Sequence, residues 1–256
     1  MSRAEETYEK FSRFYDRYWG GAFHGPALRA LEKLLFPGLF PGSAVLDLCC
    51  GAGHLAYAVA EKGFGIIGVD ISGDMLNYAR RRVPGARFIQ ADARNFRVPR
   101  RCDGAFSAFE SLNHIPDMDG FTLVLKCLGA ALVPGAVFVF DLNTEEAYLT
   151  SWGKECAIVE DDDACIVRGG YSPGEKTAWT DITLFHRGGA GWDRSDVRIS
   201  QKCHAPDEVM KALEKNGFHS VSLYKADREF GMGEDLGKGR IFVRSVYGGK
   251  LLAERT

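Results

Sequence analysis

Three aspartates stand at the ends of segments that have the pattern of buried strands, and a glycine-rich turn follows one of them. Asp47 lies in VLDLCCGAGHLA, residues 45–56, where Gly51 and Gly53 match a G-x-G-x-x-A pattern. Glycines let the backbone approach a ligand closely, and the start of the following helix supplies free N–H groups. The turn alone is weak evidence for a nucleotide site, because many turns match this pattern by chance.

The acids around the turn indicate which ligand it binds. Asp47 lies inside the strand, where burying a carboxylate is costly without a partner and where the charge would repel a pyrophosphate. Asp70 ends the next strand, seventeen residues after Gly53, and can accept hydrogen bonds from two ribose hydroxyls. Asp92, in QADAR, follows a third strand. The three acids therefore line the carboxyl edge of one sheet, and they favour a cationic ligand.

Alternating strand and helix patterns position these acids. Strands are expected at 44–48, 65–69, 87–90, 104–109 and 136–142, and helices at 7–19, 26–35, 54–62, 72–83 and 118–132. Strands separated by helix-length segments predict a parallel sheet with right-handed crossovers. The strands are almost continuously apolar, which indicates that helices cover both faces of the sheet.

The pattern changes after Asn143. Four extended runs lie between about residues 156 and 203, namely CAIVE, ACIVRGGY, TAWTDITLFHR and DVRISQKC, and the turns DDD, SPGE and GGAG separate them. These runs predict an antiparallel sheet inserted after the fifth strand. A helix at 206–216 and two strands, SVSLYKA and RIFVRSVY, are expected to complete the fold.

The composition excludes several classes of function. The 256 residues are 46% hydrophobic and carry a formal net charge of −2, so no basic field for nucleic acid is expected. No apolar run approaches the roughly 20 residues of a spanning helix, and the charged, aromatic first residues are unlike a signal peptide. We therefore expect a cytoplasmic protein with neither nucleic acid nor membrane as a partner.

The seven cysteines do not predict a metal site or a disulfide framework. Their number is odd and they contain no C-x-x-C pair. Cys49 and Cys50 are adjacent on an extended segment, so their side chains point to opposite faces and are poorly placed to share one ion. No metal site is expected.

The combination DLCCGAG, GVDIS and ADAR, in this order and spacing, resembles class I S-adenosylmethionine-dependent methyltransferases. The resemblance covers about residues 40–145, and the final two strands more weakly. It implies an α/β fold, a Rossmann-like seven-stranded sheet with helices on both faces and an antiparallel β insertion after the fifth strand. The implied division is an N-terminal helical lid (1–40), a cofactor-binding core (41–145 and 205–250) and an insertion covering the acceptor site (150–204).

The resemblance implies a role for each matching residue around the cofactor. Gly51 and Gly53 let the backbone pass close under S-adenosylmethionine. Asp47 orients its methionine moiety, and Asp70 holds its ribose hydroxyls. Cys49 stands where the family often has glycine. The complete set of implied cofactor contacts is Tyr15, Asp47, Cys49, Gly51, Gly53, Asp70, Ile71, Met75, Asp92, Ala93, Phe109 and Leu112.

The adenine is expected at the second and third strand ends. The resemblance implies that Ile71 and Met75 sandwich the ring. Asp92 accepts a hydrogen bond from the exocyclic amine, close to the N–H of Ala93. His54 replaces a common small hydroxyl residue, and we interpret it as a polar residue at a helix start.

Two further stretches are similar to a narrower group. YEKFSRFYDRYW resembles the F-x-x-x-Y-D element of small-molecule N-methyltransferases of the glycine/sarcosine and sugar-amine types, and FESLNHI resembles the segment after the fourth strand in the sugar-amine enzymes. The implied catalytic residues are Tyr15, near the sulfonium, and His114, as a base facing the acceptor. Aromatic packing of Tyr15 and a structural role of His114 stay open as alternatives. Glu110 and Asn143 are expected to line the same pocket.

The expected function is transfer of a methyl group from S-adenosylmethionine to a small molecule, most readily an amine nitrogen, leaving S-adenosylhomocysteine. O-methylation and non-catalytic cofactor binding remain alternatives. An NAD(P)-dependent reductase is disfavoured by Asp47 and Asp92 and by the absence of a Tyr-x-x-x-Lys pair, and an aminopropyltransferase by the absence of further acids after the fourth strand. The inserted sheet is a candidate homodimer surface as well as a cover for the acceptor.

Overall fold

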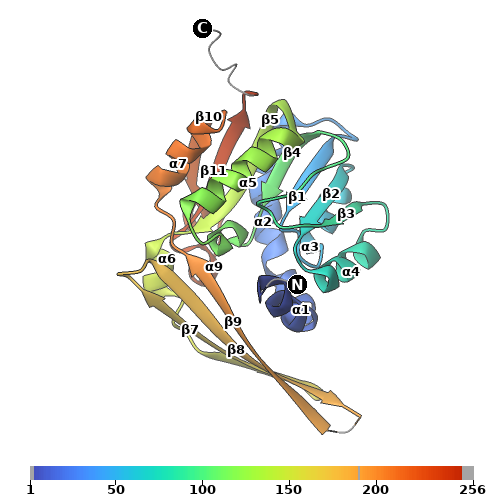
Figure 1. Cartoon of the computed structure of the whole chain (residues 1–256), viewed down its shortest axis with the longest axis vertical. Coiled ribbons are helices and arrows are strands. Elements are labelled where there is room, and N and C mark those ends of the chain that lie inside the picture. Colours follow the sequence, from blue (N-terminus) through green and yellow to red (C-terminus); the bar gives the residue numbers. More distant parts are fainter. Residues whose placement is uncertain (1–2, 190, 250–256) are drawn as a thin grey trace.

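A seven-stranded sheet forms the centre of the computed structural model, which describes residues 3–189 and 191–249 (Figure 1). Its strands are β1 (Ala44–Leu48), β2 (Gly65–Asp70), β3 (Arg87–Gln90), β4 (Cys102–Ser107), β5 (Leu132–Asn143), β10 (Phe218–Lys225) and β11 (Arg240–Tyr247). They are ordered β10-β11-β5-β4-β1-β2-β3. Strands β1 to β5 are parallel, and β11 runs antiparallel to both of its neighbours. The predicted fold class is confirmed.

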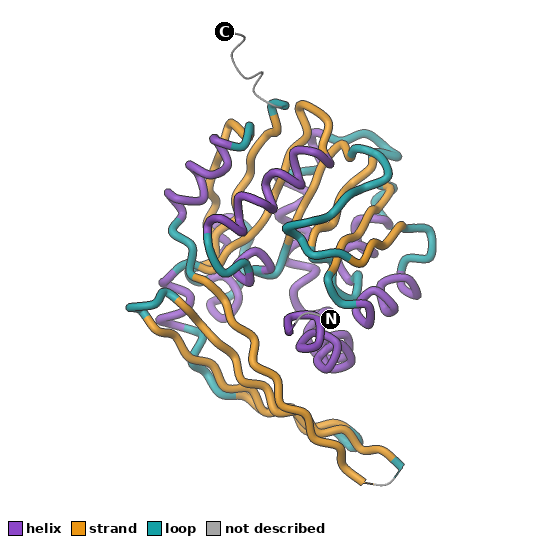
Figure 2. Tube along the Cα trace, viewed as in Figure 1, coloured by secondary structure: helices purple, strands orange, loops and turns teal. Residues whose placement is uncertain are grey.

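Helices cover both faces of this sheet (Figures 1 and 2). On one face, α5 (Met118–Ala131) and α7 (Pro206–Lys215) bury Leu125, Leu128 and Leu213 against the strands. On the other face, α2 (Gly20–Leu34) and α3 (His54–Ala60) form a second apolar cluster with β1, β4 and β5. Short helices complete the chain: η2 (Phe36–Gly38), η3 (Ser111–His114), α6 (Glu145–Thr150), α8 (Ala226–Glu229) and α9 (Glu234–Gly237).

Helix α4 (Gly73–Arg82) follows β2 and begins as its sequence predicts. Ser72 caps it by accepting a hydrogen bond from the N–H of Met75 at 3.2 Å. The cap fixes the helix start beside the end of β2, so Ile71 and Met75 are held next to Asp70.

The N-terminal segment is more continuous than expected. Helix α1 (Arg3–Phe14) passes through a π-helical turn, η1 (Tyr15–Trp19), directly into α2. The expected start of the second helix at Pro26 is therefore wrong, because Pro26 lies inside α2. Apolar residues along α2 pack on the sheet and maintain the helix through the proline, at the cost of one backbone hydrogen bond.

Four antiparallel strands form the insertion after β5. They are β6 (Cys156–Val159), β7 (Asp163–Ser172), β8 (Thr177–Gly188) and β9 (Gly191–Lys202), paired in that order. Figure 2 shows them as a long twisted ribbon that projects from the end of the main sheet. Ala190 of the predicted GGAG turn, residues 1–2 of the predicted N-terminal segment and residue 250 at the end of the predicted core lie outside the described residues.

A third apolar cluster joins the N-terminal helix to the inserted sheet. Phe11 and Phe14 of α1 pack with Ile182, Leu184 and Val197 of β8 and β9. Met75 of α4 belongs to the same cluster, so the N-terminal helix is packed between the core and the insertion (Figure 1).

A buried carboxylate adds polar contacts to this junction. Asp163, at the start of β7, is 1% exposed. It accepts hydrogen bonds from Arg17 at 2.7 Å, Tyr18 at 3.1 Å and Arg13 at 3.4 Å, and it pairs with His186 of β8 at 2.8 Å. Burial by itself raises the pKa of Asp163, but the hydrogen bonds from His186, Arg13 and Tyr18 lower it overall.

None of the described helices is both long and apolar enough to cross a membrane.

Replacing Asp163 by alanine should loosen the N-terminal helix more than the core. The change removes a buried acceptor and leaves its cationic partners without a counter-charge, so amide hydrogen exchange over residues 7–19 should accelerate at least tenfold. Asp161→Ala, at an exposed position two residues away, is the matched control and should leave exchange unchanged. Because the folded pKa of Asp163 is lowered, the same loosening should appear in the unmodified protein as the pH falls below the ordinary carboxyl range. Equal exchange in both variants would contradict this role.

Candidate active site

The loop between β1 and α3 contains three residues with left-handed backbone, Cys49, Gly51 and Gly53, at φ of 62°, 51° and 77°. The N–H of Gly51 donates to Asp70 Oδ2 at 2.8 Å. A Cβ on Gly51 would lie 3.4 Å from the ring of Tyr15, whereas one on Gly53 would lie 2.9 Å from Cβ of Ala79 in α4. Gly51 is therefore favoured by its left-handed backbone, since a side chain there would make only ordinary contact with Tyr15, whereas Gly53 is also required by the close packing of α4.

A buried carboxylate, Asp47, and a partly buried one, Asp70, flank this loop. Asp47 is 3% exposed, and its Oδ2 has no hydrogen-bond partner within the described residues. Burial, and then the charge of Asp70, raises the pKa of Asp47 well above its usual range. Asp70 instead accepts from the N–H groups of Gly51 and Ser72, the latter at 2.9 Å. An unpaired buried carboxylate fits a ligand that brings a cation or a hydrogen-bond donor.

A cavity of about 610 Å³ opens at the carboxyl edge of the sheet, between α1, the strand ends and the inserted sheet. Its walls include Tyr8, Tyr15, Cys49, Gly51, Asp70, Ile71, Met75, Asp92, Ala93, Phe109, Glu110, His114, Asn143, Gln201 and Arg240. Asp47 lines a smaller cavity of about 40 Å³, which shares Tyr15, Cys49 and Phe109 with the first. The structure thus brings together most of the predicted site residues.

Two predicted cofactor contacts lie elsewhere. Leu112 is fully buried in the cluster of α5 and the central strands, and it does not line the cavity. Gly53 lies against α4, as described above. His54 starts α3 as predicted, and its Nε2 lies 3.1 Å from Asp16 Oδ1 in η1, which also accepts from Arg82 at 2.8 Å. His54 therefore helps to join the N-terminal segment to the core.

At the end of β3, Asp92 has a partner that the sequence did not suggest. Arg94 donates from Nε and Nη2 to the two carboxylate oxygens, at 2.9 and 2.6 Å. These hydrogen bonds lower the pKa of Asp92. Ile71, Met75 and Ala93 line the cavity beside this pair.

Tyr15 lies between the two ends of the cavity. Burial raises the pKa of its hydroxyl, and the charges of Glu110, Asp70 and Asp47 raise it further, so the hydroxyl is neutral. Its ring lies 6.1 Å from that of Phe109, centroid to centroid. Tyr15 is therefore close both to the loop with Gly51 and to the acid at position 110.

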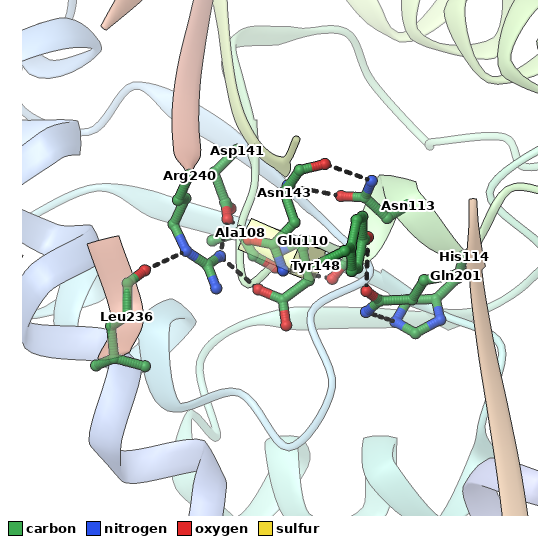
Figure 3. A network of polar contacts seen from close by, with 11 residues as sticks. Ala108, Glu110, Asn113, His114, Asp141, Asn143, Tyr148, Gln201, Leu236 and Arg240 are labelled. Carbon is green, nitrogen blue, oxygen red and sulfur yellow. Dashed lines mark hydrogen bonds and ion pairs between the residues drawn. The ribbon is translucent and has the colours of Figure 1, made fainter. Parts of the chain in front are cut away.

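Both ring nitrogens of His114 have partners. Nδ1 lies 3.1 Å from the carbonyl oxygen of Ser200, so it carries the proton and donates. Nε2 lies 3.1 Å from the amide nitrogen of Gln201 and accepts from it, while Gln201 Oε1 accepts from the hydroxyl of Tyr148 (Figure 3). Burial lowers the pKa of His114 to about 4. These contacts match the structural alternative for His114 and tie η3 to the inserted sheet.

A buried ionic cluster at the same end of the cavity was missed by the sequence analysis. Arg240, at the start of β11, pairs with Glu110 and Asp141 (Figure 3). Asp141 lies in the apolar run AVFVFDL, where, as at Asp47, burying an acid inside a strand is costly without a partner; this run was the signal for a buried cation beside it. Nothing in the sequence indicated that Gln201 lies in the site, because polar and apolar residues alternate in ISQKC as they do in an ordinary strand.

The cysteines of the loop are free thiols. Burial, followed by the nearby aspartates, raises the pKa of Cys49 and Cys50 well above the usual range, so both are protonated. Among residues 3–189 and 191–249, no three His, Cys, Asp or Glu side chains cluster as metal ligands would.

The sheet order, the glycine turn after β1 and the acids at successive strand ends define an enzyme of the Rossmann-like class that binds a nucleoside cofactor. Residues 45–135 match a family model described as a methyltransferase domain. The chain is a class I S-adenosylmethionine-dependent methyltransferase. Oδ2 of Asp47, which has no partner within the described residues, and the cavity lined by Gly51 fit this cofactor, whose amino acid moiety carries an ammonium group.

Relatives extend this likeness over different parts of the chain. The chain is 25% identical to YqeM of Bacillus subtilis (strain 168), a protein named for methyltransferase activity, over 87% of this chain and 91% of YqeM. It is 30% identical to a dTDP-3-amino-3,4,6-trideoxy-alpha-D-glucopyranose N,N-dimethyltransferase of Streptomyces venezuelae, over 53% of this chain and 57% of the relative. A ubiquinone biosynthesis O-methyltransferase of Methylococcus capsulatus is 31% identical over 55% of this chain and 63% of its own length.

Solved structures show the same fold over nearly the whole chain. An S-adenosylmethionine-dependent methyltransferase from Clostridium acetobutylicum superposes with a TM-score of 0.72 at 21% identity, covering 94% of this chain and 99% of that one.

His114 should stay neutral well below the pH at which an ordinary histidine protonates. Its pKa of about 4 in the folded state lies below 6.5, so folding releases its proton between these values and stability should rise with pH across this window. Nitrogen NMR of the imidazole, titrated from pH 8 to 4, should show the Nδ1-protonated neutral ring throughout most of that range. Protonation near pH 6.5 would mean that the hydrogen bonds to Ser200 and Gln201 do not hold in solution.

Position 49 should favour glycine over alanine. Its left-handed backbone costs about 1 kcal/mol with any Cβ, so Cys49→Gly should be about 1 kcal/mol more stable than Cys49→Ala in urea unfolding. Cys50, whose φ is not positive, provides the matched control pair, in which alanine should be the more stable. The same order at both positions would show that the loop is not strained at Cys49.

Proposed function

We propose that this enzyme methylates an amine nitrogen of a small molecule. The observation that carries the proposal is the continuity of one cavity, from Asp70 and Asp92 at the strand ends to the side chains under the inserted sheet. Its enclosure by α1 and the insertion supports a small acceptor rather than a macromolecule. The preference for nitrogen is supported by the likeness to a sugar-amine N,N-dimethyltransferase.

The loop after β1 and the end of β2 are proposed to hold the amino acid and ribose parts of the cofactor. Asp47 would receive the ammonium of the methionine moiety, directly or through water, because its buried carboxylate lacks a partner. Asp70 would accept from the ribose hydroxyls while Gly51 and Ser72 keep it in place. Cys49 lines both cavities at this point.

The adenine is proposed to lie between Ile71 and Met75, with Asp92 and the N–H of Ala93 at its polar edge. Arg94 donates to both carboxylate oxygens of Asp92. An exocyclic amine therefore has to share Asp92 with Arg94 or displace it.

The N-terminal segment (1–40) and the insertion (150–204) are proposed to cover the acceptor, while 41–145 and 205–250 form the cofactor-binding core. The apolar cluster of Phe11, Phe14 and the inserted strands supports this division, because it closes the cavity on the side away from the sheet. The inserted ribbon also stays a candidate surface for a homodimer.

The cofactor supplies a methyl group on a sulfonium, which is already a good leaving group. The chain's own residues mainly have to align the acceptor in line with that methyl and keep water out. Tyr15 is proposed to orient the reacting groups through its neutral hydroxyl, and Phe109 to pack beside them. His114 is proposed to position the acceptor end through Gln201, since neither of its nitrogens is free to take a proton without losing a partner.

Methylation of a hydroxyl oxygen is the second candidate, supported by the likeness to a ubiquinone biosynthesis O-methyltransferase. Calorimetric titration with S-adenosylhomocysteine, beside NADH as the control, tests cofactor binding first. A screen of amines and of phenols, scored by release of S-adenosylhomocysteine, then separates the two chemistries. Turnover with phenols alone would replace the proposal, and cofactor binding without any turnover would favour a non-catalytic role.

Replacing Asp70 by alanine should weaken S-adenosylhomocysteine binding at least tenfold in the same titration. The change removes the proposed acceptor of the ribose hydroxyls and the partner of the Gly51 N–H. Asp74→Ala, on the exposed side of α4, is the matched control and should bind like the unmodified protein. Unchanged affinity in Asp70→Ala would remove Asp70 from the cofactor site.

A further inference from the structure

Three charged side chains are buried together where β4 and β5 end and β11 begins. Arg240 is 4% exposed, Glu110 6% and Asp141 0%. Nη1 of Arg240 pairs with both carboxylates, and Nε donates to the carbonyl oxygen of Leu236 at 2.7 Å. With one cation and two carboxylates, this cluster has an excess negative charge that burial makes costly.

The backbone holds Glu110 in an unusual conformation. Phe109 and Glu110 both have positive φ, of 63° and 42°, which side chains other than glycine rarely adopt. The N–H of Glu110 donates to Asp141 Oδ2 at 3.0 Å, so the strained turn is held by the same cluster. Such strain persists only where the surroundings impose it, and here it directs Glu110 to the cavity.

Glu110 faces the cavity, whereas Asp141 does not line it. One carboxylate oxygen of Glu110 pairs with Arg240, and the second points away from the guanidinium (Figure 3). The guanidinium itself is packed over the ring of Phe23, 4.5 Å from its centroid. Arg240 is therefore fixed behind Glu110 and is not placed to neutralise the second oxygen.

The other cations of the cavity wall do not balance this charge. Arg94 is paired with Asp92 at the adenine end, and Lys238 is exposed at the surface. Close to Glu110 are the hydroxyls of Tyr15 and Tyr148, whose pKa values are raised by burial and by the charge of Glu110. Both tyrosines are neutral, so the charge near Glu110 stays negative.

We propose that Glu110 binds the protonated nitrogen of an aliphatic amine acceptor and accepts its proton. Asp141 and Arg240 act as positioning residues that hold the carboxylate. This inference rests on the proposed function and specifies its acceptor as an amine that is an ammonium ion in solution. An alcohol or phenol lacks the charge that the cluster requires.

The proton transfer balances within the site. An N–H bond of the ammonium breaks, its electron pair stays on nitrogen, and the proton bonds to the carboxylate oxygen of Glu110 that points away from Arg240. The neutral amine then has the lone pair that forms the N–C bond to the methyl, while the C–S electron pair leaves with sulfur. Glu110 afterwards releases its proton to water. Burial raises the pKa of Glu110 against the opposing charge of Arg240, which makes it a stronger base than an exposed carboxylate.

The test uses matched amine and hydroxyl ligands in the presence of saturating S-adenosylhomocysteine. Cyclohexylamine and cyclohexanol, and D-glucosamine and D-glucose, are titrated calorimetrically into the whole chain. At least one amine should bind ten times more tightly than its hydroxyl partner. If neither amine binds more tightly than its hydroxyl partner, the inference is overturned. This experiment uses only the unmodified protein.

Glu110→Gln tests the residue itself, and Glu208→Gln, exposed on α7, is the matched control. The amine preference should fall at least tenfold in Glu110→Gln and stay unchanged in Glu208→Gln, while both variants still bind S-adenosylhomocysteine. An unchanged preference in Glu110→Gln overturns the inference. If the unmodified protein did not bind S-adenosylhomocysteine at all, the proposed function would be contradicted. Failure of the inference about Glu110 and failure of the proposed function are therefore distinguishable.

Discussion

The burial of several carboxylates at one edge of the sheet is the constraint on which the rest of the site depends. The buried Asp47, Glu110 and Asp141 and the partly buried Asp70 would repel one another and lose hydration if each were left alone. Different groups stabilise these carboxylates: backbone N–H groups donate to Asp70, and the guanidinium of Arg240 pairs with Asp141. Oδ2 of Asp47 has no hydrogen-bond partner within the described residues, and Glu110 faces the cavity with one oxygen turned away from Arg240; these are the places where ligands are proposed to bind.

The N-terminal segment is held from two sides by the same kind of interaction. Asp16 accepts from Arg82 of the core, and Asp163 of the insertion accepts from Arg17. The π-helical turn between α1 and α2 lies at this point and presents Tyr15 to the loop with Gly51. Packing and ion pairing with both the core and the insertion thus place Tyr15 between the proposed cofactor site and the proposed acceptor site.

The sequence predicted the parts of the molecule that are encoded locally. Strand ends, the Ser72 cap and the four inserted strands follow from apolar periodicity and turn residues, so Asp47, Asp70 and Asp92 could be placed at one edge. Other contacts of the site are tertiary, and periodicity does not contain them: Arg240 pairs with Asp141 across 99 residues, and Gln201 contacts His114 from the inserted sheet. The pairing of Arg94 with Asp92 is local, but it depends on the side-chain conformation of Arg94, which residue types alone do not give.

The position of β11 between β5 and β10 has a consequence for the order in which the site matures during synthesis. A nascent chain that has been translated through β5 already contains every acid proposed to touch the cofactor. It also contains Glu110 and Asp141, but their counter-ion arrives only with Arg240. Until then two carboxylates face each other without a cation, so the acceptor end closes last and the cofactor end can be organised before it.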